Sequence, residues 1–348
     1  MRIGMIPQTV LEWVLSKMNV IPFPAEDTFV AMMQTRAIMA ANRLGVFASL
    51  AKGPASSAEL ARDLSCQVRG LEALLEAVKN SGYVVEQQGT YSLSPRARKW
   101  VTPDSSESVN WFIEFNYDNW ERMGNLEESV KAGKSLDLHA QLLDITQWRR
   151  YLYGLHDLSR MAAKEIVLRK LVGSSPKLLL DIGGGHGGYS AAFCRAYPLL
   201  RAVIFDLPQA IEIGNEIIKK HYGDVTNRIE FKEGDITKDS WGTGYDVVLL
   251  MNVIHHFEPE QIRQIFEKIM RSMNSGGVLL ILDQLRNVNK ATSYLASMAE
   301  LLFLVMTSGR SYRFDTVQDW LTEAGFINIR LKNLRVGPGA SVLAAQKN

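Results

Sequence analysis

The sequence is poor in cysteine and has no excess of charge of one sign. Only two cysteines, Cys66 and Cys194, occur among 348 residues, and they lie far apart without the spacing of metal ligands. A disulfide framework and a structural zinc site are therefore not expected, and the cysteine content favours a reducing compartment. The 39 basic and 37 acidic residues leave a net charge of +2, which predicts no broad field for nucleic acid or a membrane surface.

Long apolar runs, repeats and low-complexity tracts are also lacking. The longest apolar stretch, residues 295–306, is interrupted by Glu300 and is too short to span a bilayer. The first 24 residues have neither a long apolar core nor a small-residue cleavage site, so no secretory signal is expected. With 47% apolar and 22% charged residues, the chain has an ordinary globular composition, and we expect a cytoplasmic protein that does not contact the membrane.

The first hundred residues predict a winged helix. Residues 29–50, 56–64 and 68–81 have the apolar spacing or the capping signal of helices. Residues 83–86 and 91–93 flank a Gln-Gln-Gly-Thr turn and are typical of a hairpin. We therefore place a winged-helix-like domain at residues 1–103, followed by an aromatic-rich helical segment at 104–172 that contributes to a substrate pocket.

After the breaker at Gly173-Ser174-Ser175-Pro176, strands and helices alternate. Apolar strands that alternate with helices predict an α/β domain over residues 173–348, with a parallel sheet covered on both faces. A terminal antiparallel hairpin, with a Gly337-Pro338-Gly339 turn, completes this sheet. The predicted strands cover residues 178–182, 202–206, 229–232, 246–253, 277–282, 326–334 and 341–346, and the helices cover residues 189–197, 211–221 and 259–272.

A glycine-rich turn follows the first buried strand of this domain. The segment from Asp181 to Gly188 contains five glycines and has the pattern Gly183-x-Gly185-x-x-Gly188, which allows a tight turn and lets a ligand approach the backbone. Asp206 ends the next strand, where a carboxylate can accept hydrogen bonds from both ribose hydroxyls. The pattern alone leaves open whether the ligand is NAD or another adenosine compound.

The later strand ends decide between these ligands. The chain contains the phrases LLLDIGGGHGGYS, FDLPQAIE, EGDIT, DVVLLMNVIHHF and GGVLLILD. With them, residues 173–348 resemble a class I S-adenosylmethionine-dependent methyltransferase. When the winged-helix pattern is included, nearly the whole chain is similar to the caffeate / hydroxyindole (acetylserotonin) O-methyltransferase family. Within that family it resembles the bacterial enzymes that act on small molecules.

The resemblance implies S-adenosyl-L-methionine as cofactor, no metal, and a role for each matching residue. Ser159 would face the methionine part of the cofactor, and Leu155, Phe303 and Met306 would contact the acceptor. Asp235 is also suited to be a loop carboxylate or helix cap, and Asn252 to bond only locally. The implied cofactor-binding residues in the sheet domain are Gly183, Gly185, Asp206, Leu207, Asp235, Ile236 and Asn252.

For catalysis, the resemblance points to His256 as the general base. A histidine suits removal of a phenol or enol proton, because its usual pKa is about 6.5. The same histidine occurs in methyltransferases where it only shapes the pocket, so both roles stay open. Phe257 stands where plant members have aspartate, and the loop at residues 309–313 lacks their glutamate. Asp283 is the remaining candidate for a catalytic carboxylate beside the base. Alternatively, it is only a solvated carboxylate at the end of a strand.

We therefore predict methyl transfer to a hydroxyl of an aromatic or polyketide-like small molecule by a homodimer that pairs through its N-terminal domain. The alternatives are N- or C-methylation, non-methylating chemistry on the same fold, an NAD-dependent oxidoreductase, and a winged-helix DNA-binding regulator. The last is disfavoured because residues 68–81 carry Arg69 and Lys79 against Glu72 and Glu76, whereas phosphate contact needs positive charge.

Overall fold

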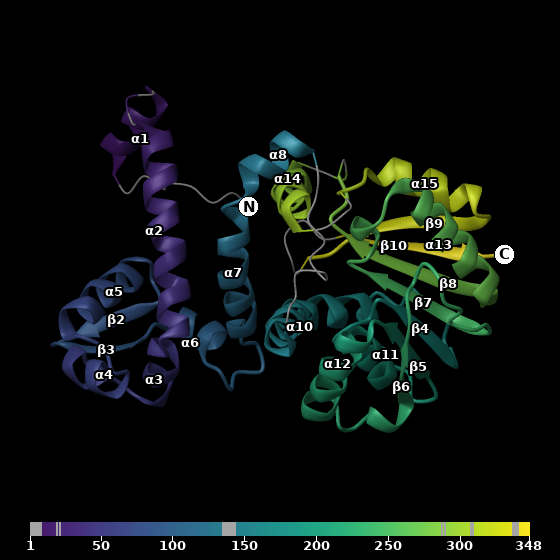
Figure 1. The fold of residues 1–348 in the computed structure, drawn as a ribbon, viewed down its shortest axis with the longest axis horizontal. Helices are drawn as coiled ribbons and strands as arrows, with labels where there is room; N and C mark the ends of the chain where they lie inside the picture. Colours follow the sequence, from purple (N-terminus) through teal and green to yellow (C-terminus); the bar gives the residue numbers. More distant parts are fainter. Residues whose placement is uncertain are drawn as a thin grey trace. The chain divides into compact units, whose positions relative to one another are not determined.

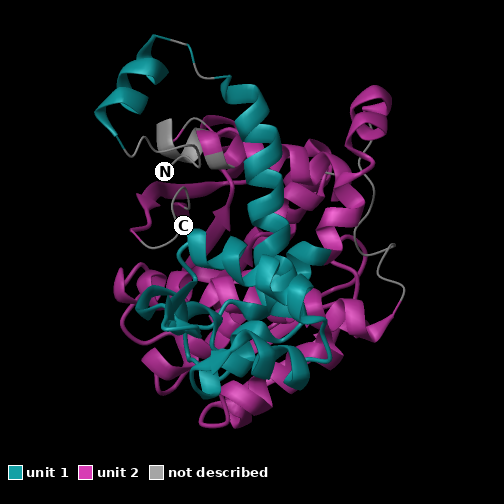
Figure 2. Cartoon of the chain, turned by 90° about the vertical axis from the view of Figure 1, so that its left-hand side faces the viewer, with its two compact units in different colours: residues 1–117 teal, residues 118–348 magenta. Residues whose placement is uncertain are grey.

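The computed structural model describes residues 9–18, 20, 22–133, 144–286, 288, 290–306, 310–335 and 341–348. The chain divides into two compact units, residues 1–117 and residues 118–348 (Figure 2). The predicted division at residues 103 and 172 is a finer one and stays a prediction. The predicted Gly337-Pro338-Gly339 turn lies outside the described residues.

Unit 1 contains six helices and a small sheet in its described part. Gly45 has φ +84°, a left-handed conformation that favours glycine, and it breaks the helical residues 29–50 into two helices. The strands pair in the order β1-β3-β2, so the predicted hairpin gains a short third strand. The elements are α1 (Val10–Lys17), α2 (Phe23–Arg43), α3 (Val46–Lys52), β1 (Ala55–Ser56), α4 (Ser57–Asp63), α5 (Val68–Asn80), β2 (Val84–Gln87), β3 (Thr90–Leu93) and α6 (Pro95–Val101).

The capping signal at Ser56 is confirmed. The hydroxyl of Ser56 accepts the backbone N–H of Glu59, and the carboxylate of Glu59 accepts the backbone N–H of Ser56, so both ends of a capping box are present. The amphipathic helix α5 turns Leu71, Leu75 and Val78 into the core of unit 1. Capping and apolar spacing thus account for the helices around the wing.

In the described part of the chain between β3 and the large sheet, three further helices follow α6. They are α7 (Asn110–Met123), which crosses the boundary between the units, α8 (Leu126–Ala132) and α10 (Ile145–Leu168). Asp144 caps α10, because its carboxylate accepts the backbone N–H of Gln147 at 2.8 Å. The long helix α10 packs against α11 and α12 of unit 2 and so becomes part of the sheet domain.

Unit 2 is built on a seven-stranded sheet in the order β6-β5-β4-β7-β8-β10-β9. The first five strands in this order pair in parallel, whereas β10 is antiparallel to both β8 and β9. The predicted terminal hairpin therefore joins the sheet through β10, which inserts between β8 and β9. The strands are β4 (Leu178–Ile182), β5 (Arg201–Asp206), β6 (Ile229–Glu233), β7 (Tyr245–Met251), β8 (Met273–Asp283), β9 (Phe326–Asn333) and β10 (Ser341–Lys347).

Helices cover both faces of this sheet (Figure 1). One layer contains α10, α11 (Gly188–Ala196) and α12 (Pro208–His221), and the other contains α13 (Pro259–Ser272) and α15 (Phe314–Glu323). The helix α14 (Lys290–Met306) packs against α8. Burial on both faces explains why the central strands are almost wholly apolar. Within the described ranges, no helix is long and apolar enough to cross a membrane.

Candidate active site

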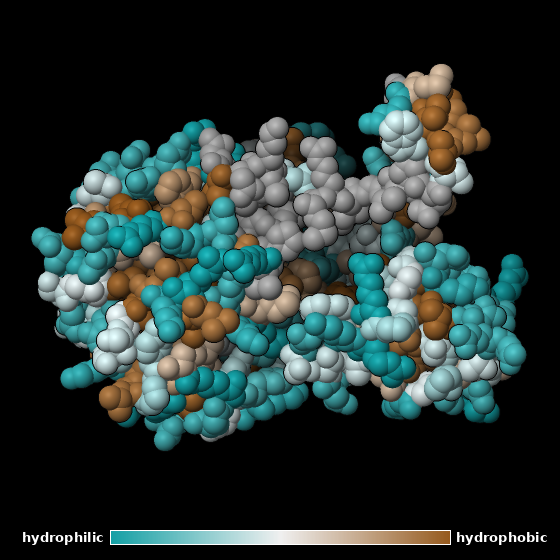
Figure 3. Space-filling view, turned by 180° about the vertical axis from the view of Figure 1, so that it is seen from behind, coloured by the Kyte–Doolittle hydropathy of each residue, from teal (hydrophilic) through white to brown (hydrophobic). Residues whose placement is uncertain are grey.

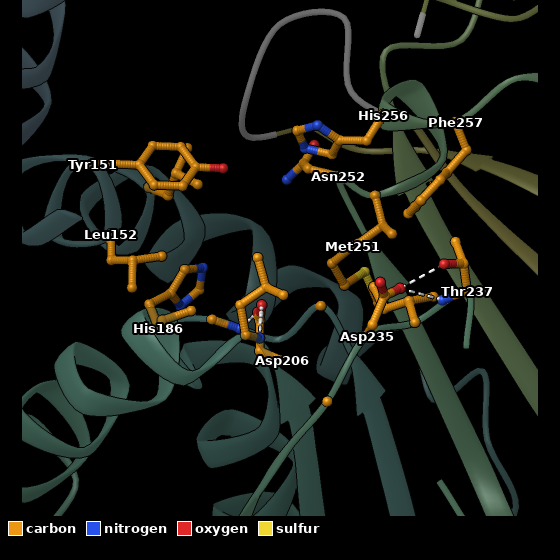
Figure 4. A pocket seen from close by; sticks show the side chains of 18 of the residues that line it. Tyr151, Leu152, His186, Asp206, Asp235, Thr237, Met251, Asn252, His256 and Phe257 are labelled. Atoms are coloured by element: carbon orange, nitrogen blue, oxygen red, sulfur yellow. Dashed lines mark hydrogen bonds between the residues drawn. The ribbon is translucent and has the colours of Figure 1, made fainter. Parts of the chain in front are cut away.

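A cavity of about 460 Å³ lies at the carboxyl ends of the parallel strands of unit 2 (Figure 4). This is the edge where open α/β sheets bind their ligands, because the loops that follow the strands diverge there. The cavity is lined by Trp148, Tyr151, Leu152, Leu155, Gly183, Gly185, His186, Asp206, Leu207, Ala210, Gly234, Asp235, Ile236, Thr237, Met251, Asn252, Val253, His256, Phe257 and Gln261.

The glycine turn after β4 leaves no room for a side chain at two of its positions. Gly183 has φ +65°, and a Cβ there would lie 2.9 Å from Cγ2 of Val253. Gly185 has φ +38°, and a Cβ there would lie 3.0 Å from Cδ2 of Leu152, on the wall of the cavity. Both positions therefore require glycine for conformation and for space, and both line the cavity.

Asp206 ends β5 beside this turn and holds it in place. Its carboxylate accepts the backbone N–H of Gly185 and that of Leu207, each at 2.7 Å. Each carboxylate oxygen can accept more than one hydrogen bond, so Asp206 can still accept hydroxyl groups from a ligand in the cavity. Leu207 lines the cavity directly after it.

Asp235, at the end of β6, is already engaged by its own loop. It accepts the backbone N–H of Thr237 at 2.8 Å and the Thr237 hydroxyl at 2.6 Å, and it forms an ion pair with Lys238 at 2.9 Å. The hydrogen bond from the Thr237 hydroxyl and the Lys238 ammonium lower the pKa of Asp235 to about 2. The carboxylate thus acts in a local turn while it also lines the cavity beside Ile236.

Asn252 follows β7 in a left-handed conformation, with φ +57°. Its backbone N–H donates to the carbonyl of Leu282 at 2.7 Å, so the neighbouring strand β8 holds this residue where it lines the cavity. Asparagine tolerates such a conformation better than most residues, and conformations of this kind cluster at functional sites.

His256 lines the cavity at the end of a short 3-10 helix, Ile254–His256, that follows β7. Its neighbour His255 is only 6% exposed and lies behind it, with the two ring centroids 4.3 Å apart. Phe303 of α14 stacks on the His255 ring at 3.9 Å between centroids and 5° between planes. His256 is therefore placed next to a packed aromatic layer.

The carboxylate of Asp283 meets His255, where the sequence had suggested His256 as its histidine. Nδ1 of His255 lies 2.9 Å from Oδ1 and 3.1 Å from Oδ2 of Asp283, and the carboxylate also accepts the backbone N–H of Gln284. Asp283 is 2% exposed, which makes the pair a buried one and not a solvated strand end. Asp283 pairs with His255 because the two adjacent rings point in different directions. The His256 ring lines the cavity, whereas the His255 ring faces Asp283 at the end of β8.

The residues expected to contact the acceptor and the methionine part are not all brought together. Leu155 lines the cavity from α10. Phe303 and Met306 are buried on α14, and neither is among the lining residues. Ser159 is also buried outside the lining, and its hydroxyl donates to the carbonyl of His156 at 2.9 Å.

Several lining residues were not singled out from the sequence. Tyr151 and Leu152 are among them. Together with Trp148 and the predicted Leu155, they recur at helical spacing on α10, a pattern that does not distinguish a core face from a pocket wall. The signal for His186 is its position, because it is the one residue other than glycine between Gly183 and Gly188. A side chain there must face either the cavity or the helix that follows the turn. In the described part of the chain, no cluster of side chains is suited to hold a metal ion.

Comparison with known proteins identifies the family. The O-methyltransferase domain profile matches residues 132–327, and the O-methyltransferase dimerisation domain profile matches residues 27–103. The chain belongs to the O-methyltransferase family. This O-methyltransferase family protein is a methyltransferase, as the resemblance had predicted, and the class I fold is confirmed as well.

Relatives of this family protein act on varied molecules. It is 26% identical over 325 residues to 3-hydroxy-5-methyl-1-naphthoate 3-O-methyltransferase of Streptomyces sahachiroi, covering 92% of this chain and 93% of the relative. It is 28% identical over 265 residues to bacteriochlorophyllide d C-20 methyltransferase of Chlorobaculum tepidum, covering 74% and 77%. Its fold matches human N-acetylserotonin methyltransferase, solved in complex with SAM, with a TM-score of 0.83, 22% identity, and coverage of 99% and 100%.

Proposed function

We propose that this protein transfers a methyl group from S-adenosylmethionine to a hydroxyl of a flat aromatic or polyketide-like small molecule. The observation that carries the proposal is a single cavity in which the glycine turn and Asp206 lie at one side and His256 at the other. A volume of about 460 Å³ is within the range of small-molecule sites. The naphthoate O-methyltransferase relative supports an aromatic acceptor.

The residues present fit the cofactor. Without a Cβ at Gly183 or Gly185, an adenosine ligand can lie against the backbone. Asp206 would accept the ribose hydroxyls while it keeps its bonds to the glycine turn, and Leu207 and Ile236 would pack on the adenine. Asp235 and Asn252 would contact the adenine edge, and Ser159 would support the methionine part from behind the turn.

Bound S-adenosylmethionine supplies an electrophilic methyl group on a sulfonium. The acceptor oxygen forms a bond to this carbon as the carbon–sulfur bond breaks, and the sulfur keeps the electron pair as a thioether. The protein aligns the oxygen with the methyl group and removes the hydroxyl proton. We assign that proton to the ring of His256, which lines the cavity and is backed by His255 and, through it, by Asp283.

The proposal is tested in two measurements on the full chain. Calorimetry is expected to show binding of S-adenosylhomocysteine and none of NADH, because the residues that line the cavity fit the adenosine and the methionine part of S-adenosylhomocysteine. A panel of phenols, naphthols and hydroxylated polyketides, incubated with methyl-labelled S-adenosylmethionine, is then expected to yield a labelled product with the mass increase of one methyl group. Binding of NADH, or absence of S-adenosylhomocysteine binding, contradicts the cofactor assignment.

C-methylation is a second candidate reaction, favoured by the similarity to the bacteriochlorophyllide C-20 methyltransferase. It would use the same cavity, with a carbon nucleophile in place of the oxygen. Fragmentation of the product by mass spectrometry separates the two reactions, since an O-methyl group leaves under conditions in which a C-methyl group stays.

We further propose that the protein forms a homodimer through unit 1. The match to the dimerisation domain covers residues 27–103. Apolar side chains on α1 and α2 are exposed in the single chain, among them Leu11 at 66%, Trp13 at 54% and Phe29 at 65%. Hydrophobic surface is visible over α1 at the upper right of Figure 3. Burial of such surface drives association. Light scattering should give the mass of two chains, and Phe29→Glu should give one chain, whereas exposed Leu199→Glu in unit 2 should not change the mass.

A role in reading DNA is not part of this proposal. On α5, Lys79 is held by Glu76 at 2.6 Å and by Glu86 at 2.8 Å, so its charge is neutralised within the unit. A helix that contacts phosphates needs unpaired positive charge. We place the enzyme in the cytoplasm, in keeping with its two free cysteines.

A further inference from the structure

His186 stands inside the glycine turn, between Gly185 and Gly187, and no role has been assigned to it. Its side chain is 7% exposed and lines the cavity, with the ring next to Leu152 (Figure 4). Nδ1 accepts the backbone N–H of Gly188, the first residue of α11, at 2.9 Å. No hydrogen bond to Nε2 occurs among the described residues, so the ring has one engaged nitrogen and one that is available to a ligand.

The engaged nitrogen determines what the other one can offer. Because Nδ1 accepts a hydrogen bond, it carries no proton, and the neutral ring must carry its proton on Nε2. Burial lowers the pKa of His186 to about 4, and His156, whose ring centroid lies 5.8 Å away, is also buried with its pKa lowered to about 2. At neutral pH the ring is therefore an uncharged N–H donor, which suits an anion and does not suit an ammonium or a sulfonium.

The order of the strands indicates which part of the cofactor reaches this donor. Asp235 and Ile236 follow β6, Asp206 ends β5, and the glycine turn follows β4, and these three strands are neighbours in the sheet. A ligand with its adenine at β6 and its ribose at β5 extends its amino-acid tail to the end of β4. The tail then reaches His186, the lining residue that follows Gly185 in the turn.

We infer that His186 donates its Nε2 proton to the carboxylate of the methionine part of the cofactor and so selects ligands that carry this tail. The inference rests on the proposed cofactor. It makes His186 a binding residue with two separate tasks, since Nδ1 supports the turn and Nε2 contacts the ligand. Substitutions that keep one task and remove the other can therefore separate them.

The test is calorimetric titration of the full chain with S-adenosylhomocysteine and with 5′-methylthioadenosine, which has the same adenosine and sulfur but no carboxylate. In His186→Asn, the amide oxygen can still accept the N–H of Gly188, but no donor reaches the Nε2 position. We expect the Kd for S-adenosylhomocysteine to rise about 10- to 100-fold, as for loss of a hydrogen bond to a charged group. The Kd for methylthioadenosine should stay within about twofold.

A second pair of variants controls for a structural effect of the substitution on the glycine turn. His186→Gln places an N–H near the position of Nε2, whereas His186→Met has a similar length and no donor. Gln is expected to bind S-adenosylhomocysteine at least about tenfold more tightly than Met, with equal affinity of both for methylthioadenosine. Equal losses for both ligands in these variants, or unchanged binding of S-adenosylhomocysteine in His186→Asn, would overturn the inference. If the unmodified protein binds methylthioadenosine but not S-adenosylhomocysteine, the cofactor proposal fails together with it.

Discussion

The two ends of the cavity are built in different ways. The cofactor end, formed by Gly183, Gly185 and Asp206 at the ends of β4 and β5, is held by backbone geometry and by bonds to backbone N–H groups. The acceptor end, formed by His256 with His255 behind it, depends on side chains that pack on one another, with Asp283 and Phe303 as the further partners. The first end is determined by short segments of chain, and the second by residues that are distant in sequence.

Because the two ends of the cavity are held by different interactions, we expect them to respond to mutation independently. Changes at the cofactor end should alter the affinity for S-adenosylhomocysteine, whereas changes at the acceptor end should alter the rate and leave that affinity almost unchanged. Distant, unconnected sites usually act additively, so a double substitution with one change at each end offers a direct check.

The largest effect is expected for His256→Ala. Loss of a positioned general base commonly lowers a rate by about 10²- to 10⁴-fold, and the turnover number with an acceptor identified from the panel should fall by this amount. The Kd for S-adenosylhomocysteine should stay within about twofold. His221→Ala, at an exposed histidine outside the cavity, is the matched control. A variant that keeps the full rate would show that His256 only shapes the pocket.

Asp206→Ala should give the next largest effect, now at the cofactor end. It removes the acceptor for two backbone N–H groups and for the ribose hydroxyls, and a loss of about 2–3 kcal/mol corresponds to a roughly 30- to 160-fold weaker Kd for S-adenosylhomocysteine. Asp235→Ala should weaken it less, because Asp235 is already engaged by Thr237 and Lys238. Asp224→Ala, an exposed carboxylate outside the cavity, should have no effect. Equal effects of the first two would contradict the distinction drawn between these carboxylates.

Asp181 in β4 predicts a pH effect on stability at the cofactor end. Burial raises the pKa of this carboxyl to about 7, and its Oδ1 is buried without a hydrogen-bond partner, whereas Oδ2 accepts the Ser190 hydroxyl at 2.7 Å. The folded state therefore binds a proton more tightly than the unfolded chain, whose carboxyl has a pKa of 3.8. The resulting cost is absent below about pH 4, grows as the pH rises, and is complete above about pH 7.

Asp181→Asn removes this titration and keeps an acceptor for Ser190. Between pH 5 and pH 8, the unmodified protein should lose roughly 2 kcal/mol more in its free energy of unfolding than the variant does. Urea denaturation at the two pH values measures the difference. Parallel pH dependence in both proteins would show that Asp181 keeps one protonation state throughout this range.

The smallest effect is expected for Asp283→Asn at the acceptor end. The change removes a negative charge that reaches His256 only through His255, so we expect a roughly tenfold lower turnover number and unchanged binding of S-adenosylhomocysteine. Asp315→Asn, at an exposed aspartate, serves as control. A weaker Kd for S-adenosylhomocysteine would break the separation of the two ends.

The cofactor end could be read from the sequence because its signals are local. Glycines between a buried strand and a helix, and an aspartate at the next strand end, occupy neighbouring strands in any doubly wound sheet. The structure accordingly brings Gly183, Gly185, Asp206 and Leu207 to one cavity. The parallel pairing and most element bounds follow from the same alternation of apolar strands and helices, whereas the order of the strands was not predicted.

The acceptor end could not be read in the same way. Nothing in the pattern His255-His256 tells which ring turns toward Asp283, since the outcome depends on the short helix at residues 254–256 and on Phe303. Phe303 and Met306 have the spacing of a pocket wall, yet a buried helix face has the same spacing. On α10, Leu155 was predicted, but Tyr151 and Leu152 were missed for the same reason, because they do not differ in type from core residues.

The bond from Gly185 to Asp206 has a consequence for how ligands bind. Both groups in this 2.7 Å contact belong to the chain itself, so the glycine turn is held by protein atoms, and binding need not freeze a free loop. The amide proton of Gly185 should accordingly exchange slowly with solvent deuterium even in the ligand-free enzyme. Association would then be limited by entry of the ligand into the cavity, and affinity would be adjusted through the lifetime of the complex.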